Sequence, residues 1–359
     1  MLDSIVSLAS DLISVPSTRE SPEKLHEVLD TALKTLPGFK FKKFINHDCP
    51  SLLIYNRWPE NGRFKVILNA HLDVVPGRPE QYSAKVKDKK LTGRGAIDMK
   101  AAGAAEIIAF KNAAPGVNYP LALQLVTDEE IGGHFGTKYQ ISQGILTDFY
   151  LCGEFSDLGL CCDTKGVLWI KLTAHGKKAH GAFLWNGVNA ITKLSEEITA
   201  IKKLFPVPLK EAWKTTCNFG VIVGGNTVNQ VPDTAGVTMD IRHISTDLSK
   251  NIIAKIKSHL IYSDTVIEII EDEPYNHADK NHPLVKLLSE TVTLVTGNKA
   301  DYVKFHGASD ARHYSAAGCT ALDIGPAGEG LHGDYEWVDL KSLGQFYRVL
   351  EKFLFSIKI

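Results

Sequence analysis

Three apolar stretches of the chain each run directly into polar residues with chemically useful side chains. They are residues 64–70, 119–126 and 148–153, which lead into His71, Thr127–Glu130 and Glu154. Helix-like stretches follow at residues 100–113 and 134–143, so strands and helices alternate as a mainly parallel sheet requires. Ligands bind at the carboxyl ends of strands in such sheets. The pattern therefore predicts an α/β fold with its functional residues at these strand ends.

The order of elements changes after Gly166. From there the apolar pattern predicts a strand, a helix, two strands, a helix and a strand, at residues 167–176, 187–203, 217–225, 234–243, 248–260 and 265–270. This βαββαβ order is typical of a ferredoxin-like fold. The α/β pattern then resumes toward the end of the chain. We therefore expect a discontinuous larger domain, residues 1–165 and 274–359, with a smaller domain, residues 166–273, inserted into it.

Net charge and the spacing of basic residues limit the classes of partner that the protein is expected to bind. The 359 residues carry a net charge of −1 and no basic run longer than a Lys-Lys pair, which argues against nucleic-acid or membrane binding. We expect a small-molecule partner. Residues 1–20 fit an amphipathic helix rather than a signal peptide or a membrane span, because Asp3 and Asp11 interrupt the apolar pattern. The six cysteines include no CxxC pair and fit buried thiols of a cytoplasmic protein.

Two pairs of residues at the strand ends indicate a cation site. His71 and Asp73 leave the same face of an extended segment, so the Asp73 carboxylate can fix the imidazole tautomer for metal binding. Taken alone, His71 could equally be a buried histidine satisfied by hydrogen bonds. Glu129 and Glu130 are adjacent carboxylates, and like charges this close are costly unless a cation lies nearby.

Three further residues extend this set. Asp98 follows a Gly-X-Gly turn and opens a predicted helix, where the plain alternative is a helix N-cap. Glu154 ends an apolar strand, and His332 lies in a glycine-rich loop. Carboxylate and imidazole ligands without cysteine favour zinc, cobalt or manganese.

Five motifs in fixed order now resemble those of the M20 family of metallopeptidases. They are HLDVV, GRGAIDMK, TDEEIGG, the Gly-Glu of residues 153–154, and the stretch from Gly325 to Glu336 that contains His332. Within the family the sequence is most similar to the acetylornithine deacetylase and succinyl-diaminopimelate desuccinylase group. The resemblance spans nearly the whole chain. It implies a zinc-peptidase-like catalytic domain with a mainly parallel central sheet, and an inserted ferredoxin-like dimerisation or lid domain.

The resemblance also implies roles for individual residues. It implies two divalent metal ions, with zinc favoured over cobalt or manganese, held by five residues: His71 and Glu154 for one ion, Glu130 and His332 for the other, and Asp98 as the bridge. Glu129 would be the general base, and Asp73 a catalytic residue that orients His71. The peptide bond between Asp98 and Met99 would be cis.

Further expectations concern the contact with substrate. The segment GKKAHGAFLWNGVNAI resembles the family segment that carries a catalytic histidine, here His180, although Leu184 or its neighbour stands where a proline is common. In dimeric relatives this histidine reaches the metal ions of the neighbouring subunit, so we expect a homodimer. Asn229, Arg242 and Ser309 match substrate-binding or site-loop positions, and a surface ion pair is the alternative for Arg242.

The expected activity is removal of an acetyl or succinyl-like group from an N-acyl amino acid. A dipeptidase or aminopeptidase of the same family would use the same motifs on a substrate with a free amino group. The stretch after Glu154 lacks the arginine-rich segment of a typical desuccinylase, which favours a different acyl group or amino acid. A non-catalytic metal-binding or substrate-binding relative is the remaining alternative, but Glu129 and all five ligand positions are present.

Overall fold

The computed structural model describes residues 1–358 and divides the chain into two compact units. Unit 1 comprises Met1–Asp163, Asn276–Phe305 and the residues from Ser309 onward. Unit 2 comprises Thr164–Tyr275 and His306–Ala308. The chain thus leaves unit 1 after Asp163, forms nearly all of unit 2, and then returns to unit 1.

The centre of unit 1 is a nine-stranded sheet in the order β1-β2-β6-β3-β7-β17-β8-β15, with β16 paired to β8. The strands are β1 (Lys40–Asn46), β2 (Cys49–Tyr55), β3 (Arg63–His71), β6 (Leu121–Val126), β7 (Leu146–Cys152), β8 (Leu160–Thr164), β15 (Asn276–His277), β16 (Tyr302–Phe305) and β17 (Thr320–Asp323). Strands β6, β3, β7 and β17 run parallel, whereas β1, β2 and β8 pair antiparallel. This arrangement confirms the α/β fold with a mainly parallel central sheet.

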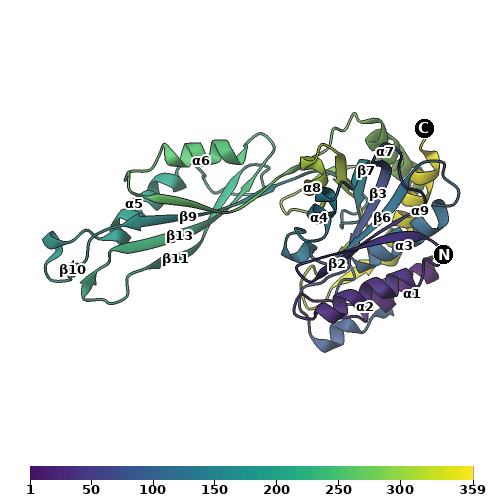
Figure 1. Ribbon diagram of the computed structural model, residues 1–359, viewed down its shortest axis with the longest axis horizontal. Coiled ribbons are helices and arrows are strands. Elements are labelled where there is room, and N and C mark those ends of the chain that lie inside the picture. The colour runs from purple at the N-terminus through teal and green to yellow at the C-terminus, as the bar shows by residue number, and fades with distance from the viewer. Residues whose placement is uncertain (359) are drawn as a thin grey trace. The chain divides into compact units, whose positions relative to one another are not determined.

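Helices cover both faces of this sheet. They are α1 (Leu2–Ile13), α2 (Pro22–Leu33), α3 (Lys100–Ala113), α4 (Thr137–Ser142), α7 (Pro283–Thr296), α8 (Ala311–Ala316) and α9 (Leu340–Ser356). Figure 1 shows α4 and α8 on one side of the strands and α3 and α9 on the other. Because both faces are covered, every residue of β6 is buried. The close packing of α3 depends on Gly103, where an added Cβ would lie 3.0 Å from that of Ala70 in β3.

Short elements beside the sheet carry the loops of the candidate site. A small sheet of unit 1 has the order β18-β19-β5-β4. Its strands are β4 (Lys85–Lys87), β5 (Lys90–Thr92), β18 (Gly328–Glu329) and β19 (Trp337–Asp339), and two single 3₁₀ turns are η1 (Pro79–Tyr82) and η2 (Glu129–Ile131). Pairing of β19 with β5 brings the chain around residue 330 next to the chain around residue 95.

Unit 2 has its own antiparallel sheet and its own core. Its main elements follow in the order β9 (Gly166–His175), α5 (Ala190–Lys202), β11 (Thr216–Gly224), β13 (Thr234–His243), α6 (Ser249–Lys257) and β14 (Val266–Glu273). The sheet has the order β11-β13-β9-β14, and each neighbouring pair is antiparallel. A second small ladder joins β10 (Ala179–His180) to β12 (Gln230–Val231), and the turn η3 spans Leu184–Asn186.

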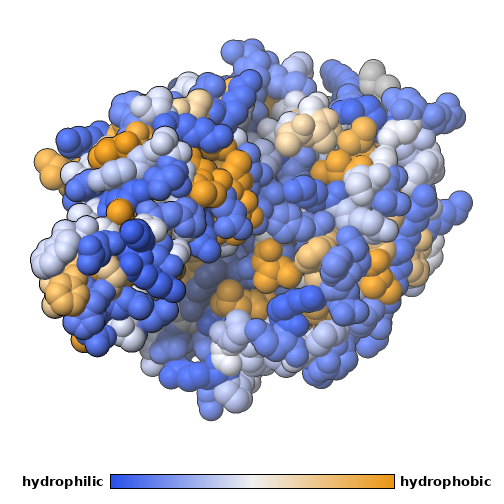
Figure 2. Space-filling model, turned by 60° about the vertical axis from the view of Figure 1, so that its left-hand side comes forward, coloured by the Kyte–Doolittle hydropathy of each residue, from blue (hydrophilic) through white to orange (hydrophobic). Residues whose placement is uncertain are grey.

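The surface is hydrophilic over most of the face in Figure 2, with apolar residues in separate patches. In unit 2 one run of exposed apolar residues lies on β11, which forms an edge of its sheet. Val221, Ile222 and Val223 are 58%, 63% and 59% exposed. Within residues 1–358, none of the helices has the length and apolar character needed to cross a membrane.

Candidate metal centre

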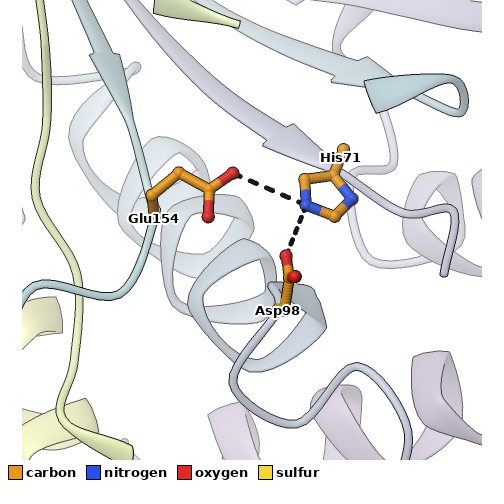
Figure 3. Close-up of side chains that lie close together, drawn as sticks. All are labelled: His71, Asp98 and Glu154. Carbon is orange, nitrogen blue, oxygen red and sulfur yellow. Dashed lines mark hydrogen bonds and ion pairs between the residues drawn. The ribbon is translucent and has the colours of Figure 1, made fainter. Parts of the chain in front are cut away.

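His71 is the last residue of β3, and its imidazole is fully buried at the carboxyl end of the sheet. Its Nδ1 lies 3.1 Å from the backbone oxygen of Asp73 and 3.5 Å from the carboxylate of the same residue, so Nδ1–H is donated toward Asp73. Its Nε2 lies 2.8 Å from Asp98 Oδ1 and 3.6 Å from Glu154 Oε1, and Figure 3 shows both carboxylates directed at this nitrogen. Asp73 therefore holds the ring with Nε2 turned toward two potential co-ligands of a cation.

A second group of potential ligands shares Asp98 with the first. His332 Nε2 lies 3.1 Å from Asp98 Oδ2 and 3.2 Å from Glu130 Oε2. Within each group, one ligand atom per residue lies within 4.8 Å of the others. The structure thus brings His71, Asp98, Glu130, Glu154 and His332 together, with Asp98 common to both groups.

The turn before α3 directs Asp98 at the two imidazoles. The N-cap of α3 is Met99, and no side chain caps the helix, which excludes the capping alternative for Asp98. The peptide bond between Asp98 and Met99 is cis, as the resemblance implied. The backbone N–H groups of Ile97 and Asp98 donate to Glu336 Oε1 at 3.0 and 3.2 Å. The buried carboxylate of Glu336 therefore fixes the backbone of the turn that carries Asp98.

Arg94 and Glu336 form a support that the sequence analysis did not single out. Arg94 Nη1 lies 2.8 Å from Glu336 Oε2, and the two side chains are only 4% and 1% exposed. Arg94 Nη2 also donates to the carbonyl oxygens of His332 and Gly333, each at 3.2 Å. These bonds hold His332 in place although its φ of +58° is unusual for a residue with a side chain. The sequence offered one indication of this ion pair: Arg94 lies within the motif GRGAIDMK, and the oppositely charged Glu336 ends the stretch that contains His332.

The charges of the two groups fit divalent cations. Burial raises the pKa of Glu154 well above its ordinary value, and the nearby Asp98 adds to this rise. Burial also acts to raise the pKa of Asp98, but hydrogen bonds from His332 and His71 outweigh it and hold the pKa well below its ordinary value. Hydrogen bonds to Asp98 and Glu130 raise the pKa of His332 to about 10. Crowded carboxylates whose ionised form needs a nearby positive charge, together with imidazole nitrogens, are the donor set of a zinc-type site.

Glu129 lies next to these groups without belonging to either. Burial is the largest cause that raises the pKa of its carboxyl well above the ordinary value. The charge of His71 opposes the rise and that of Asp310 adds to it. A carboxylate that binds a proton more readily than usual, close to two groups of potential metal ligands, can accept a proton from a water molecule there.

The turn η2 that carries Glu129 and Glu130 is anchored at both ends. The N–H of Glu130 donates to Asp73 Oδ2 at 3.0 Å. At the other end, the carbonyl oxygen of Gly132 accepts hydrogen bonds from Arg312 Nη2 at 2.6 Å and from His313 Nε2 at 3.0 Å. Arg312 and His313 lie in the first turn of α8, shortly after the predicted site-loop residue Ser309, so this segment also fixes the turn η2.

His180 and Asn229 lie side by side in unit 2. The pairing of β10 with β12 places the N–H of Gly181 2.7 Å from the carbonyl oxygen of Asn229. The N–H of Ala182 donates to His180 Nδ1 at 3.1 Å, which leaves the proton of a neutral ring on Nε2. Both side chains are exposed. This part of unit 2 therefore presents an imidazole Nε2–H donor to the surroundings.

The remaining two predicted residues make polar contacts of their own. Arg242 Nε donates to Asp240 Oδ1 at 2.8 Å on β13, and the side chains are 32% and 33% exposed. The ion pair considered as the alternative for Arg242 is therefore present. In unit 1, the buried Ser309 donates its hydroxyl to Asp323 Oδ1 at 2.7 Å.

Two curated relatives and two solved structures are informative. A succinyl-diaminopimelate desuccinylase from Hahella chejuensis is 25% identical over 99% of this chain and 98% of its own length. A probable carboxypeptidase from Emericella nidulans is 28% identical over 66% of this chain, and the chain spans only 62% of that relative. Aminopeptidase PepT from Bacillus cereus has a TM-score of 0.80 at 18% identity, with coverage of 99% of this chain and 98% of that one. An M20 family metallo-carboxypeptidase from Sulfolobus solfataricus has a TM-score of 0.78 at 18% identity, with 98% of each chain covered.

The family model gives the most direct comparison. The model described as peptidase family M20/M25/M40 matches residues 67–356, which include every candidate ligand identified above. The two solved structures share the fold of this chain. The chain belongs to peptidase family M20/M25/M40.

Proposed function

We propose that this protein is a metal-dependent hydrolase that removes an acyl group, such as acetyl or succinyl, from an N-acyl amino acid. The observation that carries the proposal is the pair of ligand groups that share Asp98, with the carboxyl of Glu129 close by. Similarity to a desuccinylase over almost the entire chain supports an acyl amino acid as substrate.

We assign the two ligand groups to two divalent ions, with zinc favoured over cobalt or manganese. His71 and Glu154 would hold one ion, Glu130 and His332 the other, and Asp98 both. When bound, the ions supply polarisation of the scissile carbonyl and compensation for the negative charge that develops on its oxygen. The donor set of oxygen and imidazole nitrogen, without a thiolate, supports this assignment.

Glu129 acts as the general base in this proposal. Its carboxylate takes a proton from the attacking water and later delivers a proton to the leaving nitrogen. General bases work best when their pKa lies near the working pH, and burial moves the pKa of Glu129 in that direction. Asp73 contributes by holding His71 through Nδ1 and Glu130 through its backbone N–H.

We further propose that the protein is a homodimer in which unit 2 supplies His180 to the site of the neighbouring subunit. The Nε2–H of His180 would donate to the developing oxyanion, and Asn229 and Arg242 would contact the substrate, Arg242 through a carboxylate. The exposed apolar residues on the edge strand β11 support an interface, because an edge strand can pair with its counterpart across a two-fold axis.

A second candidate function is that of a peptidase that acts on dipeptides or on the carboxyl end of short peptides. The names of the Emericella nidulans relative and of similar curated relatives favour it, since these are probable carboxypeptidases. Such an enzyme would use the same ligand groups and Glu129 on a peptide bond.

A substrate panel separates the two candidates. Purified protein loaded with zinc or cobalt is incubated with N-acetyl amino acids, N-succinyl amino acids and dipeptides, and released amine is measured. We expect turnover of the N-acyl amino acids, with a Glu129→Gln variant as the matched control. A clear preference for dipeptides would support the peptidase. Absence of turnover with every substrate in metal-loaded protein would contradict both candidates.

A further inference from the structure

Arg19 stands in the segment between α1 and α2, beside the chain that follows β3. Ser17 donates its hydroxyl to the carbonyl oxygen of Leu72 at 2.5 Å, and its own carbonyl oxygen accepts from the N–H of Val74 at 3.0 Å. These two bonds hold the segment against the chain on both sides of Asp73. The side chain of Arg19 is exposed just beyond this contact. Arg19 therefore presents a cation to water at the edge of the candidate metal centre.

Two acceptors without charge fix the guanidinium of Arg19. Its Nη1 donates to Cys49 Sγ at 3.1 Å, and its Nη2 donates to the carbonyl oxygen of His47 at 3.0 Å. Burial is the largest cause that raises the pKa of Cys49 to about 11, so this thiol is protonated near neutral pH. Within residues 1–358, Arg19 has no carboxylate partner. Its charge is therefore not balanced by the protein, and most of the N–H donors of the guanidinium remain available.

The position of Cys49 relates this guanidinium to the ligand groups. Cys49 begins β2, and Thr127 Oγ1 donates to the carbonyl oxygen of Pro50 at 2.7 Å, so the start of β2 lies beside the end of β6. In the sheet, β6 lies between β2 and β3. Neighbouring strands are about 4.8 Å apart, so the start of β2 lies roughly 10 Å across the sheet from the end of β3, which carries His71.

A substrate whose acyl group carries its own carboxylate fits this spacing. A succinyl group holds a carboxylate two methylene groups beyond the scissile carbonyl, whereas an acetyl group ends in a methyl group. The stretch after Glu154 lacks an arginine-rich segment, so a cation for such a carboxylate would come from another part of the chain. Arg19 is suited to this task because it is fixed and uncompensated, and because the planar fork of a guanidinium matches the two oxygens of a carboxylate.

We propose that Arg19 is a specificity-determining residue that binds the distal carboxylate of a dicarboxylic acyl group such as succinyl. The inference rests on the proposed function, because it places the scissile carbonyl at the ligand groups that share Asp98. It goes further by choosing acyl groups with a free carboxylate over acetyl. It also assigns their recognition to the segment between α1 and α2 and to the start of β2, all within unit 1.

A neutral isostere of the substrate isolates the contribution of the carboxylate. N-succinyl-L-alanine and N-succinamoyl-L-alanine differ only in a carboxylate against an amide at the end of the acyl group. Zinc-loaded wild type should hydrolyse the succinyl compound with a kcat/KM at least about tenfold higher, because hydrogen bonds to charged groups are the stronger ones. In Arg19→Met this ratio should fall to about one, and Arg19→Lys should keep part of it, since an ammonium retains the charge but not the planar fork.

Arg57→Met is the matched control. Arg57 is also exposed, and its Nη2 donates to the carbonyl oxygen of Val117 at 2.9 Å, but it follows the opposite end of β2. Each substitution removes one positive charge of unit 1 and one hydrogen bond to a backbone carbonyl. The melting temperatures of both variants should fall by similar small amounts, and only Arg19→Met should change the ratio. An equal change in Arg57→Met would reveal a general charge effect and overturn the proposal.

Calorimetric titration of the zinc-loaded Glu129→Gln variant with the same two compounds gives a readout without turnover. We expect the succinyl compound to bind at least about tenfold more tightly than the succinamoyl compound. Addition of Arg19→Met to this variant should remove the preference. Equal affinity for the two compounds before that addition would overturn the proposal.

The outcomes also separate this inference from the proposed function. Hydrolysis of N-acyl amino acids with equal kcat/KM for the two compounds would overturn the inference and leave the proposed function standing. A folded Arg19→Met variant with a lower melting temperature and an unchanged ratio would make Arg19 a structural residue of the turn between β1 and β2. Binding that depends on Arg19, in a protein that hydrolyses no substrate of the panel, would support the carboxylate site and contradict the proposed function.

Discussion

Arg94 in unit 1 and Arg242 in unit 2 each hold a carboxylate at 2.8 Å, but in very different surroundings. The pair of Arg94 with Glu336 is almost fully buried, and both partners make further bonds to the chain around His332 and Asp98. The pair of Arg242 with Asp240 is about one-third exposed and leaves the terminal nitrogens of the arginine available. The same distance therefore corresponds to a fixed, fully bonded support in one unit and to a partly exposed, partly satisfied arginine in the other.

This difference extends to several of the candidate site residues, although His332 in unit 1 is itself exposed and is held through its backbone by Arg94. In unit 1, His71, Asp98 and Glu154 are buried, and they are oriented by other protein groups. In unit 2, the side chains of His180 and Asn229 are exposed. The candidate ligands of unit 1 are thus held by other protein groups, whereas His180 and Asn229 of unit 2 are exposed and, in our proposal, gain their contacts from a ligand or a second subunit. The following experiments test that division.

Removal of metal should have the largest effect. If the ligand groups of unit 1 hold catalytic cations, dialysis against a chelator should abolish hydrolysis, and zinc or cobalt should restore it. Activity on the best substrate of the panel is measured before and after, together with metal content by elemental analysis. Full activity in protein shown to be free of metal would contradict the assignment of these groups.

Glu129→Gln should lower kcat by about 10²–10⁴-fold, because the variant loses a general base while keeping its size. Metal content should stay at the wild-type level, since Glu129 lies outside both ligand groups. Kinetics and elemental analysis on the same preparation give both values. If metal and activity were lost in parallel, Glu129 would be a ligand instead.

Arg94→Met should destabilise the folded protein by about 3–5 kcal/mol, because it leaves the carboxylate of Glu336 buried without its partner. Chemical denaturation monitored by circular dichroism measures the free energy of unfolding. A variant in which Glu336→Gln accompanies Arg94→Met should recover part of the loss, since it removes the unpaired charge. A change below about 1 kcal/mol in the single variant would show that burial does not decide the strength of this pair.

His180→Ala should lower kcat by about 10²–10³-fold if the imidazole donates to the developing oxyanion. Metal content and the melting temperature should change little, because the side chain is exposed. Mixing this variant with Glu129→Gln tests action in the neighbouring subunit, since heterodimers would regain one site with both residues. No recovery after confirmed subunit exchange would place the action of His180 within its own chain or remove it altogether.

Arg242→Met should have the smallest effect on stability, about 0–1 kcal/mol, because its ion pair is partly exposed to water. The KM for a substrate with a free carboxylate should rise, whereas the KM for the corresponding amide should not. Denaturation curves and steady-state kinetics provide the two readouts. A loss of stability as large as that of Arg94→Met would remove the contrast between the two units.

The sequence predicted the site residues that stand at the end of an apolar strand or within a short motif. Apolar runs that end in His71 and Glu154 predict buried strand ends, and parallel strands bring such ends together. The partnership of Arg94 with Glu336 was not predictable in this way, because the two residues are 242 positions apart. Within unit 2, a cavity lined by Lys165 and Arg242 depends likewise on His306, which comes from a distant part of the chain. Such contacts are created by the packing of loops, which leaves no periodic signal.

The insertion of unit 2 has a consequence for the synthesis of the protein. In the finished sheet β17 lies between β7 and β8, but β17 is made only after all of β9 to β14. Unit 2 is almost continuous in sequence, so we expect it to fold on the ribosome before the sheet of unit 1 can close. At a synthesis rate of roughly 5–20 residues per second, a time on the order of ten seconds passes between the synthesis of β8 and that of β17, the strand that lies between β7 and β8. During that time the nascent chain exposes unpaired strand edges, and protection of these edges by chaperones would determine the yield of folded enzyme.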